Sequence, residues 1–193
     1  MQNHQLINAS SSDVEYFTPP SIVSAARWFF NGVVHLDPAS CHAANQNVGA
    51  VRFMTKEQDA ISLPWVGETV FLNFPFGRQE PACSPDCTKK HVHHDYDLHG
   101  NAAWVSKLVS EFSAGNFNEA CCLCYAATSE KWFRPLLNYP QCFLHGRTNY
   151  LLPDGTVKKG VTKGSVVTYL GPNVNRFAQS FKHLGTVKLP YQY

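Results

Sequence analysis

Residues 73–76, Asn-Phe-Pro-Phe, combine groups that can hold an amino group attached to a planar ring. They directly follow an apolar run, 69–72, that is typical of a buried strand. The Asn73 amide oxygen and the Phe74 carbonyl can accept hydrogen bonds, while Pro75 stiffens the loop. Phe76 offers a flat ring face. This set suits the amino group of a flipped-out adenine. The structural alternative is an Asn-initiated turn with two core aromatic residues.

A second group of chemically active residues lies in segment 77–100, which is rich in Cys, His and Pro and has no apolar periodicity. The spacing is Cys83-x3-Cys87-x3-His91-x-His93, and zinc favours tetrahedral sets of Cys and His. Because this polar loop cannot bury its own core, a structural zinc ion would order it. The alternative is a His-rich loop with incidental thiols. A zinc deaminase is excluded, because the chain has no His-x-Glu element.

The composition is that of an ordinary globular chain. Its 193 residues are 44% hydrophobic and 16% charged, which fits one domain at roughly 150 residues per domain. No run approaches the ~18 apolar residues of a membrane span, so no membrane association is expected. The polar N-terminus lacks a signal-peptide pattern, which predicts a cytoplasmic protein whose cysteines are thiols or metal ligands. A net charge of +2 permits a nucleic-acid partner without requiring one.

Apolar periodicity and Gly and Pro signals predict the elements that position these residues. Helices are expected from Pro19-Pro20 to Gly32, from a Ser40 cap to about residue 53, across 104–112, from a Thr128 or Ser129 cap across 132–136, and at 173–184. Strands are expected at 33–36, 69–72, 120–125, 141–144, 148–152, 165–170 and 186–189. Residues 1–13 are expected to form a flexible tail. Cys121, Cys122 and Cys124 lie on an apolar strand and are expected to be buried.

Alternating strands and helices predict an α/β fold with a mixed, mostly parallel central sheet flanked by helices. Ligands bind such sheets at the carboxyl ends of the strands. Two predicted strand ends carry polar residues followed by proline. One is Asp37-Pro38-Ala39, and the other begins at Asn73. We therefore expect Asp37 and Asn73 to belong to one site.

These motifs and their order resemble the small phage-type DNA N6-adenine methyltransferases that use S-adenosylmethionine. Residues 16–20, Tyr-Phe-Thr-Pro-Pro, are similar to the family's aromatic-Thr-Pro segment, and residues 37–39 to its Asp-Pro-Ala motif. Residues 73–76 stand where the family has Asn-Pro-Pro-(Tyr/Phe). Further matches in the family's order are Trp65-Val66-Gly67, Trp132-Phe133 and Gly146-Arg147. Each motif is short, but their shared order from about residue 15 to about residue 187 is specific.

The resemblance implies a class I, Rossmann-like methyltransferase domain over residues 14–193, with 77–100 as a Cys/His-rich inserted loop. The implied reaction is transfer of a methyl group from S-adenosylmethionine to adenine N6 in DNA. The implied base-holding residues are Asn73, Phe74, Pro75 and Phe76. The implied cofactor-binding residues are Phe17, Thr18, Pro19, Asp37, Pro38, Ala39, Asp59 and Asn73. In that assignment Asp37 holds the cofactor's α-ammonium group and Asp59 accepts from its adenine.

DNA contact is expected from basic residues late in the chain, which are Arg147, Lys158, Lys159 and Lys163. The alternative is a set of ordinary surface side chains. Because the chain has no room for a separate recognition domain, DNA selectivity would come from segment 77–100 and this basic segment. Neither the recognition sequence nor the oligomeric state is encoded in these motifs.

The chain departs from the family at Phe74, which replaces the first proline of the motif. Phe keeps the backbone carbonyl that the chemistry uses, but it loses the fixed φ of proline and adds bulk. Two alternatives stay open at this point. One is N4-cytosine methylation, which uses a similar motif, and the other is a catalytically impaired methyltransferase-like protein that binds nucleic acid.

Overall fold

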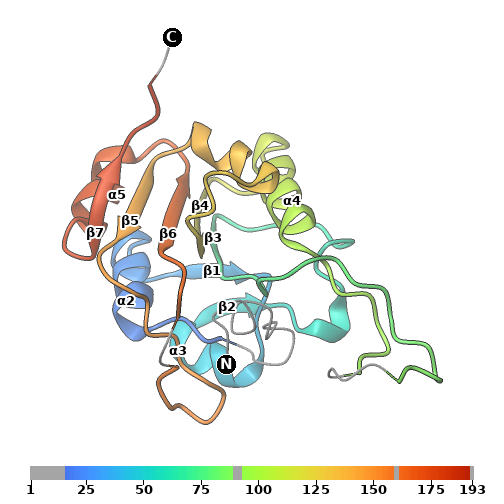
Figure 1. Ribbon diagram of the computed structural model, residues 1–193. Helices are drawn as coiled ribbons and strands as arrows, with labels where there is room; N and C mark the ends of the chain where they lie inside the picture. Colours follow the sequence, from blue (N-terminus) through green and yellow to red (C-terminus); the bar gives the residue numbers. More distant parts are fainter. Residues whose placement is uncertain (1–15, 89–92, 159–160, 192–193) are drawn as a thin grey trace.

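A seven-stranded sheet organises the computed structural model, which describes residues 16–88, 93–158 and 161–191 (Figure 1). The strands lie in the order β2-β1-β3-β4-β6-β5-β7. Their bounds are β1 (Val34–Asp37), β2 (Ala50–Phe53), β3 (Thr69–Leu72), β4 (Glu119–Tyr125), β5 (Gln141–Leu144), β6 (Ser165–Leu170) and β7 (Gly185–Lys188). The tail expected at 1–13 lies outside the described residues.

The sheet is mixed, and its two halves pair differently. Strands β2, β1, β3 and β4 are parallel, whereas β6 is antiparallel to β4 and β5, and β7 is antiparallel to β5. The expected α/β sheet is confirmed, but parallel pairing does not predominate, since three of the six strand pairs are antiparallel. Parallel neighbours need a crossover connection, and the described residues between β5 and β6 form no helix.

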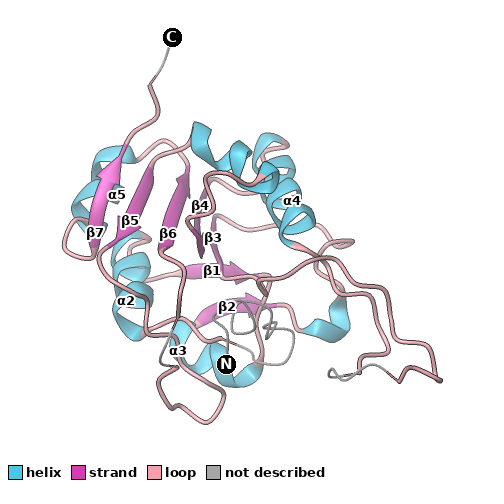
Figure 2. Cartoon of the chain, viewed as in Figure 1, coloured by secondary structure: helices cyan, strands magenta, loops and turns pink. Residues whose placement is uncertain are grey.

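Helices flank the sheet in two groups (Figure 2). The α-helices are α2 (Pro20–Phe29), α3 (His42–Val48), α4 (Asn101–Ser113) and α5 (Val174–Phe181), and the 3-10 helices are η2 (Lys56–Gln58) and η3 (Lys131–Asn138). Helix α2 contacts α3 and α5, whereas α4 contacts η3. Within the described part of the chain, no helix has the length and apolar character needed to span a membrane.

The first helix and strand follow the sequence signals closely. Pro20 occupies the first turn of α2, where its missing N–H costs nothing, and the helix buries an apolar face that includes Ile22 and Phe29. Asn31 and Gly32 then take positive φ values of 58° and 91°, which end the helix and turn the chain into β1.

The helix expected from Ser40 to about residue 53 is wrong at both ends. Cys41, not Ser40, caps α3, because its Sγ accepts from the backbone N–H of Ala44. Gly49 ends α3 in a left-handed conformation with φ of 66°. The chain is then extended over 50–53 and forms the edge strand β2, which the sequence analysis missed.

Two other expected elements differ from the structure. Glu130 precedes η3, so neither Thr128 nor Ser129 caps it, and this helix is of the 3-10 type with Pro135 inside it. The strand expected at 148–152 is reduced to isolated bridges, in which Leu151 pairs with Phe17 and with Val157. Among the described residues only these two bridges form there, because Leu151 meets two short segments and not a complete neighbouring strand.

Buried strands fix the edge at which the site lies. Every residue of β3 and β6 is buried, and Cys121, Cys122 and Cys124 of β4 are fully buried as expected. Strands β1, β3 and β4 are parallel, so their carboxyl ends lie at the same end of the sheet, which we call the carboxyl edge. The last residues of these strands are Asp37, Leu72 and Tyr125. Residues 77–100 are the insertion, and its described parts, 77–88 and 93–100, extend away from the body of the molecule (Figure 1).

Candidate active site

Asn73 follows β3 at the carboxyl edge, and the two ends of its amide have different surroundings. Its Nδ2 donates to the Tyr16 carbonyl at 3.0 Å, which fixes the orientation of the side chain. Its Oδ1 is buried and accepts no hydrogen bond from the described residues. A buried acceptor without a donor costs about 1–3 kcal/mol. The site therefore holds an oriented acceptor that a ligand amino group would satisfy.

Phe74 turns its side chain into the core. It is 1% exposed, and its ring lies parallel to that of Trp104 with the centroids 6.1 Å apart. The Phe74 ring also makes edge-to-face contacts with the rings of Phe76 and Trp132. The bulk of Phe74 is thus accommodated among buried aromatic side chains.

Phe76 belongs to a group of four rings at the carboxyl edge, which we call the aromatic group and which comprises Tyr16, Phe76, Tyr125 and Tyr150. The Phe76 ring centroid lies 4.3 Å from that of Tyr125 and 6.0 Å from that of Tyr150. Tyr16 lies 5.8 Å from Tyr150. Since Phe76 is 8% exposed, it offers a base less ring surface than the sequence analysis expected.

Tyr125 was not identified from the sequence as a site residue. It ends β4 and is partly exposed, and burial raises the pKa of its hydroxyl to about 12, with the nearby Tyr16 adding to the shift. The hydroxyl is therefore protonated at neutral pH. The signal that could have identified it is its place at the end of an apolar strand neighbouring the strand that leads to Asn73.

Asp37 ends β1 and is 3% exposed. Burial raises the pKa of its carboxyl to about 7, although the Ala39 N–H, which donates to Oδ1 at 3.2 Å, lowers it. Pro38 is buried and Ala39 partly buried in the same turn. A buried carboxyl of this kind gains most from a cationic partner.

The segment that precedes α2 connects these strand ends. The Tyr16 carbonyl accepts from Asn73, and the buried Thr18 carbonyl accepts from the Asn47 side chain of α3 at 2.8 Å. Phe17 pairs with Leu151 through two backbone hydrogen bonds of 2.8 and 3.0 Å, and Pro19 is the N-cap of α2. The structure thus brings this segment to Asn73, as the resemblance implies.

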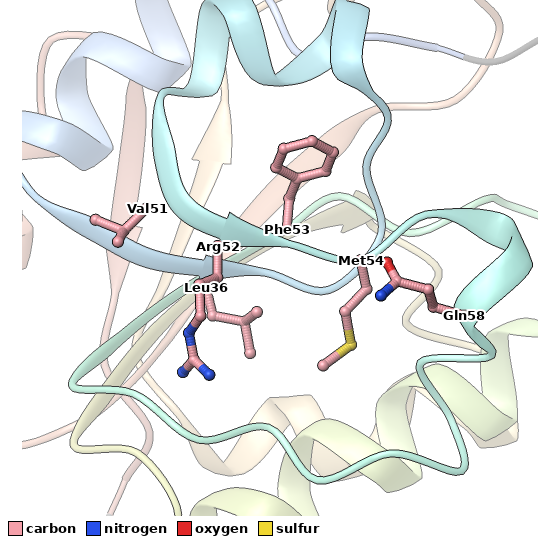
Figure 3. A pocket seen from close by; sticks show the side chains of 6 residues that line it. All are labelled: Leu36, Val51, Arg52, Phe53, Met54 and Gln58. Atoms are coloured by element: carbon pink, nitrogen blue, oxygen red, sulfur yellow. The ribbon is translucent and has the colours of Figure 1, made fainter.

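A pocket of about 360 Å³ lies beside the ends of β1 and β2 (Figure 3). Its lining residues are Leu36, Val51, Arg52, Phe53, Met54 and Gln58. Met54 joins it to the first site, because its N–H donates to the Asp37 carbonyl at 2.9 Å. In Figure 3 the Met54 and Gln58 side chains point into the same space, on the side away from Phe53.

Asp59 follows this pocket but is not a vacant acceptor. Its Oδ1 lies 2.7 Å from His99 Nε2 at the end of the insertion. Burial raises its pKa, yet hydrogen bonds from His99 and Ser62 outweigh that effect and the net shift is downward. The carboxylate thus ties the insertion to the segment after β2.

Three of the four expected DNA-contacting residues lie in segments next to the aromatic group, and the charged group of Lys163 contacts it. Lys163 Nζ lies 5.5 Å from the centroid of the Tyr125 ring. The Arg147 guanidinium borders Gly164, since a Cβ placed on that glycine would lie 3.4 Å from its Nη1. Lys158 donates its backbone N–H to the Tyr150 carbonyl at 2.8 Å. Lys159 lies outside the described residues.

The insertion brings metal-ligating side chains together. Ligand atoms of Cys83, Cys87 and His93 all lie within 4.8 Å of one another, and His91 lies outside the described residues. Two backbone contacts pair the arms of the insertion: the Glu80–Leu98 bridge and the Cys83 N–H, which donates to the His94 carbonyl at 2.8 Å. A pocket of about 330 Å³ lies here, lined by Cys83, Ser84, Pro85, His93, His94 and Asp95.

An oriented amide acceptor, a buried carboxyl and a ring-lined edge together form a site suited to a ligand that carries an amino group. The sequence model of the DNA N-6-adenine-methyltransferase (Dam) family matches residues 7–178. No curated protein and no solved structure matches the chain. The chain belongs to the DNA N-6-adenine-methyltransferase (Dam) family, as the order of its motifs indicates. DNA adenine N6-methylation is the general activity of that family.

Proposed function

We propose that the protein transfers a methyl group from S-adenosylmethionine to N6 of an adenine that is flipped out of duplex DNA. The observation that carries this proposal is the buried Asn73 Oδ1, which is oriented by the Tyr16 carbonyl and accepts no hydrogen bond from the described residues. An adenine amino group supplies the missing donor. Flipping the base costs a few kcal/mol, which contacts in the pocket must offset.

The adenine amino nitrogen is a weak nucleophile because its lone pair is delocalised into the ring. Asn73 Oδ1 and the Phe74 carbonyl would accept its two hydrogens, which favours a more tetrahedral nitrogen with a directed lone pair. When bound, S-adenosylmethionine supplies an electrophilic methyl group. The two acceptors hold the amino group in place until its surplus proton leaves to water. Proximity and fixed dipoles supply the rate enhancement.

The residues at the ends of β1 and β3 fit the cofactor. Asp37 would pair with the α-ammonium group, and Phe17, Thr18 and Pro19 would line the methionine end. The apolar side chains of Leu36 and Met54 border a pocket that suits a purine ring, and Gln58 adds a polar group to it. We place the adenosine moiety there, with Asp59 at its border.

Phe74 favours an active enzyme over an impaired relative. Its ring is buried and packed on Trp104, so the core accommodates the bulk that replaces the proline. Adenine and cytosine present the same amino donor, so the acceptor pair alone also suits N4-cytosine methylation. The family match favours adenine.

Three further features accompany this function. We propose a class I, Rossmann-like domain over 14–193, supported by the parallel order β2-β1-β3-β4 and by the antiparallel β6 beside β4. A structural zinc ion held by Cys83, Cys87, His93 and His91 is supported by the clustering of the first three. We place the enzyme in the cytoplasm of a bacterium or of a phage-infected cell, in phage protection or restriction–modification.

Expression in a host without DNA methylation tests the proposal. We expect N6-methyladenine in the host DNA by mass spectrometry, and Asn73→Ala to lower the methylation rate of purified protein at least about 100-fold. The matched control is Asn118→Ala, an exposed asparagine just before β4 at the opposite edge, which keeps the wild-type rate. N4-methylcytosine in place of N6-methyladenine would change the assigned base. The absence of both methylated bases would refute the function.

A further inference from the structure

Tyr125 lies where a flipped base would meet the protein. In the β3–β4 register Leu72 is opposite Cys122, so Tyr125 is as far along β4 as Pro75 is beyond β3. Its ring is therefore level with the motif that contains Asn73, and it lies against Phe76 at 4.3 Å. This position is on the neighbouring strand and outside the four-residue motif.

The two rings differ in the surface they offer. Phe76 is 8% exposed and is packed between Tyr125 and Tyr150, whereas Tyr125 is partly exposed. Stacking of a base requires an accessible ring face. Of these two rings, Tyr125 has the larger accessible surface.

The Tyr125 ring contacts the cation of an exposed side chain. Lys163 is exposed and its Nζ lies 5.5 Å from the Tyr125 centroid. An exposed cation–π contact strengthens an association about 2- to 5-fold, whereas stacking of a base on an aromatic residue contributes about 5- to 150-fold. A base can therefore displace the ammonium group, which then becomes available to a phosphate.

We propose that Tyr125 is the residue on which the flipped target base stacks, and that Lys163 leaves this ring to contact a DNA phosphate. The inference rests on the proposed function and extends it to a residue outside the motif. It assigns Phe76 a supporting role, in which its ring holds that of Tyr125 in place. It also links entry of the base to engagement of the backbone.

Three variants test the stacking role in purified full-length protein, on a duplex that carries the methylation site mapped in host DNA. Tyr125→Leu removes the ring and is expected to lower kcat/KM about 5- to 150-fold. Tyr125→Phe keeps the ring and is expected to restore most of the loss. Tyr139→Leu, a partly buried tyrosine packed on Phe112, is the matched control for loss of a ring and is expected to keep kcat/KM. Cofactor affinity by calorimetry shows that each variant is folded.

Two measurements give direct readouts. With 5-iodouracil in place of the target adenine, irradiation is expected to crosslink Tyr125, which mass spectrometry identifies. Lys163→Met is expected to lower the slope of log K against log salt by about 0.9, whereas Tyr125→Leu leaves that slope unchanged.

The outcomes distinguish failure of the Tyr125 stacking role from failure of the proposed function. Loss of activity in Tyr125→Leu with normal cofactor binding, together with the Tyr125 crosslink, supports the inference. A Tyr125→Leu protein with wild-type kcat/KM, or a crosslink to Phe76 in place of Tyr125, overturns it while the proposed function stands. Absence of any methylation by the wild-type protein overturns the proposed function, and this inference with it.

Discussion

The Asn73 side chain serves as both anchor and acceptor at the carboxyl edge. Its Nδ2 donates to the Tyr16 carbonyl, so rotation of the amide would break this hydrogen bond and place two acceptors, Oδ1 and the Tyr16 carbonyl oxygen, beside each other. The acceptor is thus oriented before any substrate arrives, which is the arrangement that lowers reorganisation during a reaction. This orientation depends on a contact between residues 57 positions apart in the sequence.

Burial of the Asp37 carboxyl destabilises its ionised form. Burial raises its pKa to about 7 from the ordinary 3.8, so ionised Asp37 costs about 4 kcal/mol relative to water. Since the folded-state pKa lies above the unfolded value, this group favours folding most below pH 4. That contribution is lost as the pH rises through 7. A cationic ligand reverses the penalty, because it pairs with the ionised form.

Binding of S-adenosylmethionine is therefore expected to depend on pH through Asp37. In the proposed site the ammonium group of the cofactor would pair with the Asp37 carboxylate, so binding below the pKa of about 7 would require deprotonation of Asp37. We expect the affinity to fall about tenfold per pH unit below pH 6, as measured by calorimetry between pH 5 and pH 7. Asp37→Asn is expected to bind weakly with little pH dependence. An affinity of the wild type that stays constant over this range would contradict the role of Asp37.

Phe74 illustrates how packing can replace a covalent constraint. Proline fixes φ through its ring, whereas Phe74 is held by a parallel stack on Trp104 and by the edges of Phe76 and Trp132. Aromatic pairs of this kind contribute about 0.5–1.5 kcal/mol each beyond their buried area. The loop is thereby attached to α4, the helix that carries Trp104.

At the scale of elements, the insertion is connected to the body at its base. The Gly77 N–H donates to Asn101 Oδ1 at 3.0 Å, and His99 pairs with Asp59. Further out, the arms meet at the Glu80–Leu98 bridge and at Cys83. The outer part of the insertion has no large apolar side chain among its described buried residues, so metal ligation would supply its order.

Removal of the metal is expected to release the insertion and to leave the sheet intact. Cys83→Ser and Cys87→Ser should lower the zinc content from about one ion per chain to nearly none, as measured by elemental analysis. Limited proteolysis should then cut within 78–99, while the thermal midpoint of the body shifts little. Cys41→Ser is the control, because serine also caps a helix and this site is outside the cluster. Wild-type protein that purifies without zinc would refute the metal site.

The elements that were predicted correctly are those with strong local signals. Strands β3 and β6 were placed at their observed bounds because every residue in them is buried. Strand β2 was missed because it is an edge strand with exposed Val51 and Arg52, and because Gly49 separates it from α3 in one turn. The extended segment at 148–152 finds only single bridge partners, which depend on where residues 17 and 157 lie.

The candidate site was likewise predictable where its residues have local sequence signals and not where they depend on strand pairing or distant contacts. Asn73 and Asp37 were predicted because each follows an apolar run and is followed by a proline within two residues. Tyr125 lay in a predicted strand, but only the β3–β4 register brings it level with the motif. The pairing of Asp59 with His99 joins residues 40 positions apart, and no spacing rule relates them.

At the scale of the whole molecule, a net charge of +2 conceals an uneven distribution. Lys163 contacts the aromatic group and Arg147 and Lys158 lie in segments next to it, whereas the acidic Asp37 is buried at the end of β1. DNA affinity depends on the charges that face the phosphates and not on the total. A nearly neutral chain can thus bind a polyanion through one small face.

The salt dependence of DNA binding is expected to show whether the basic residues near the aromatic group contact DNA phosphates. Replacing Arg147, Lys158 and Lys163 together by Gln should lower the slope of log K against log salt by about 2 to 3, as measured by fluorescence anisotropy with a mixed-sequence duplex. Arg27→Gln is the control, since Arg27 borders Gly49 at the start of β2, the opposite end of that strand from the site. An unchanged slope in the triple variant would place the DNA on another face.

The closeness of the two ends of the insertion has a consequence for protein engineering. Because Gly77 and Asn101 are hydrogen-bonded to each other, the chain closes at this point whatever lies between them. The entropy cost of a longer loop grows only with the logarithm of its length, so a graft here adds little strain to the body. The segment between Gly77 and Asn101 is thus an insertion point beside the strand ends. A domain that recognises a DNA sequence could be inserted there from another protein to direct the chain to new sites.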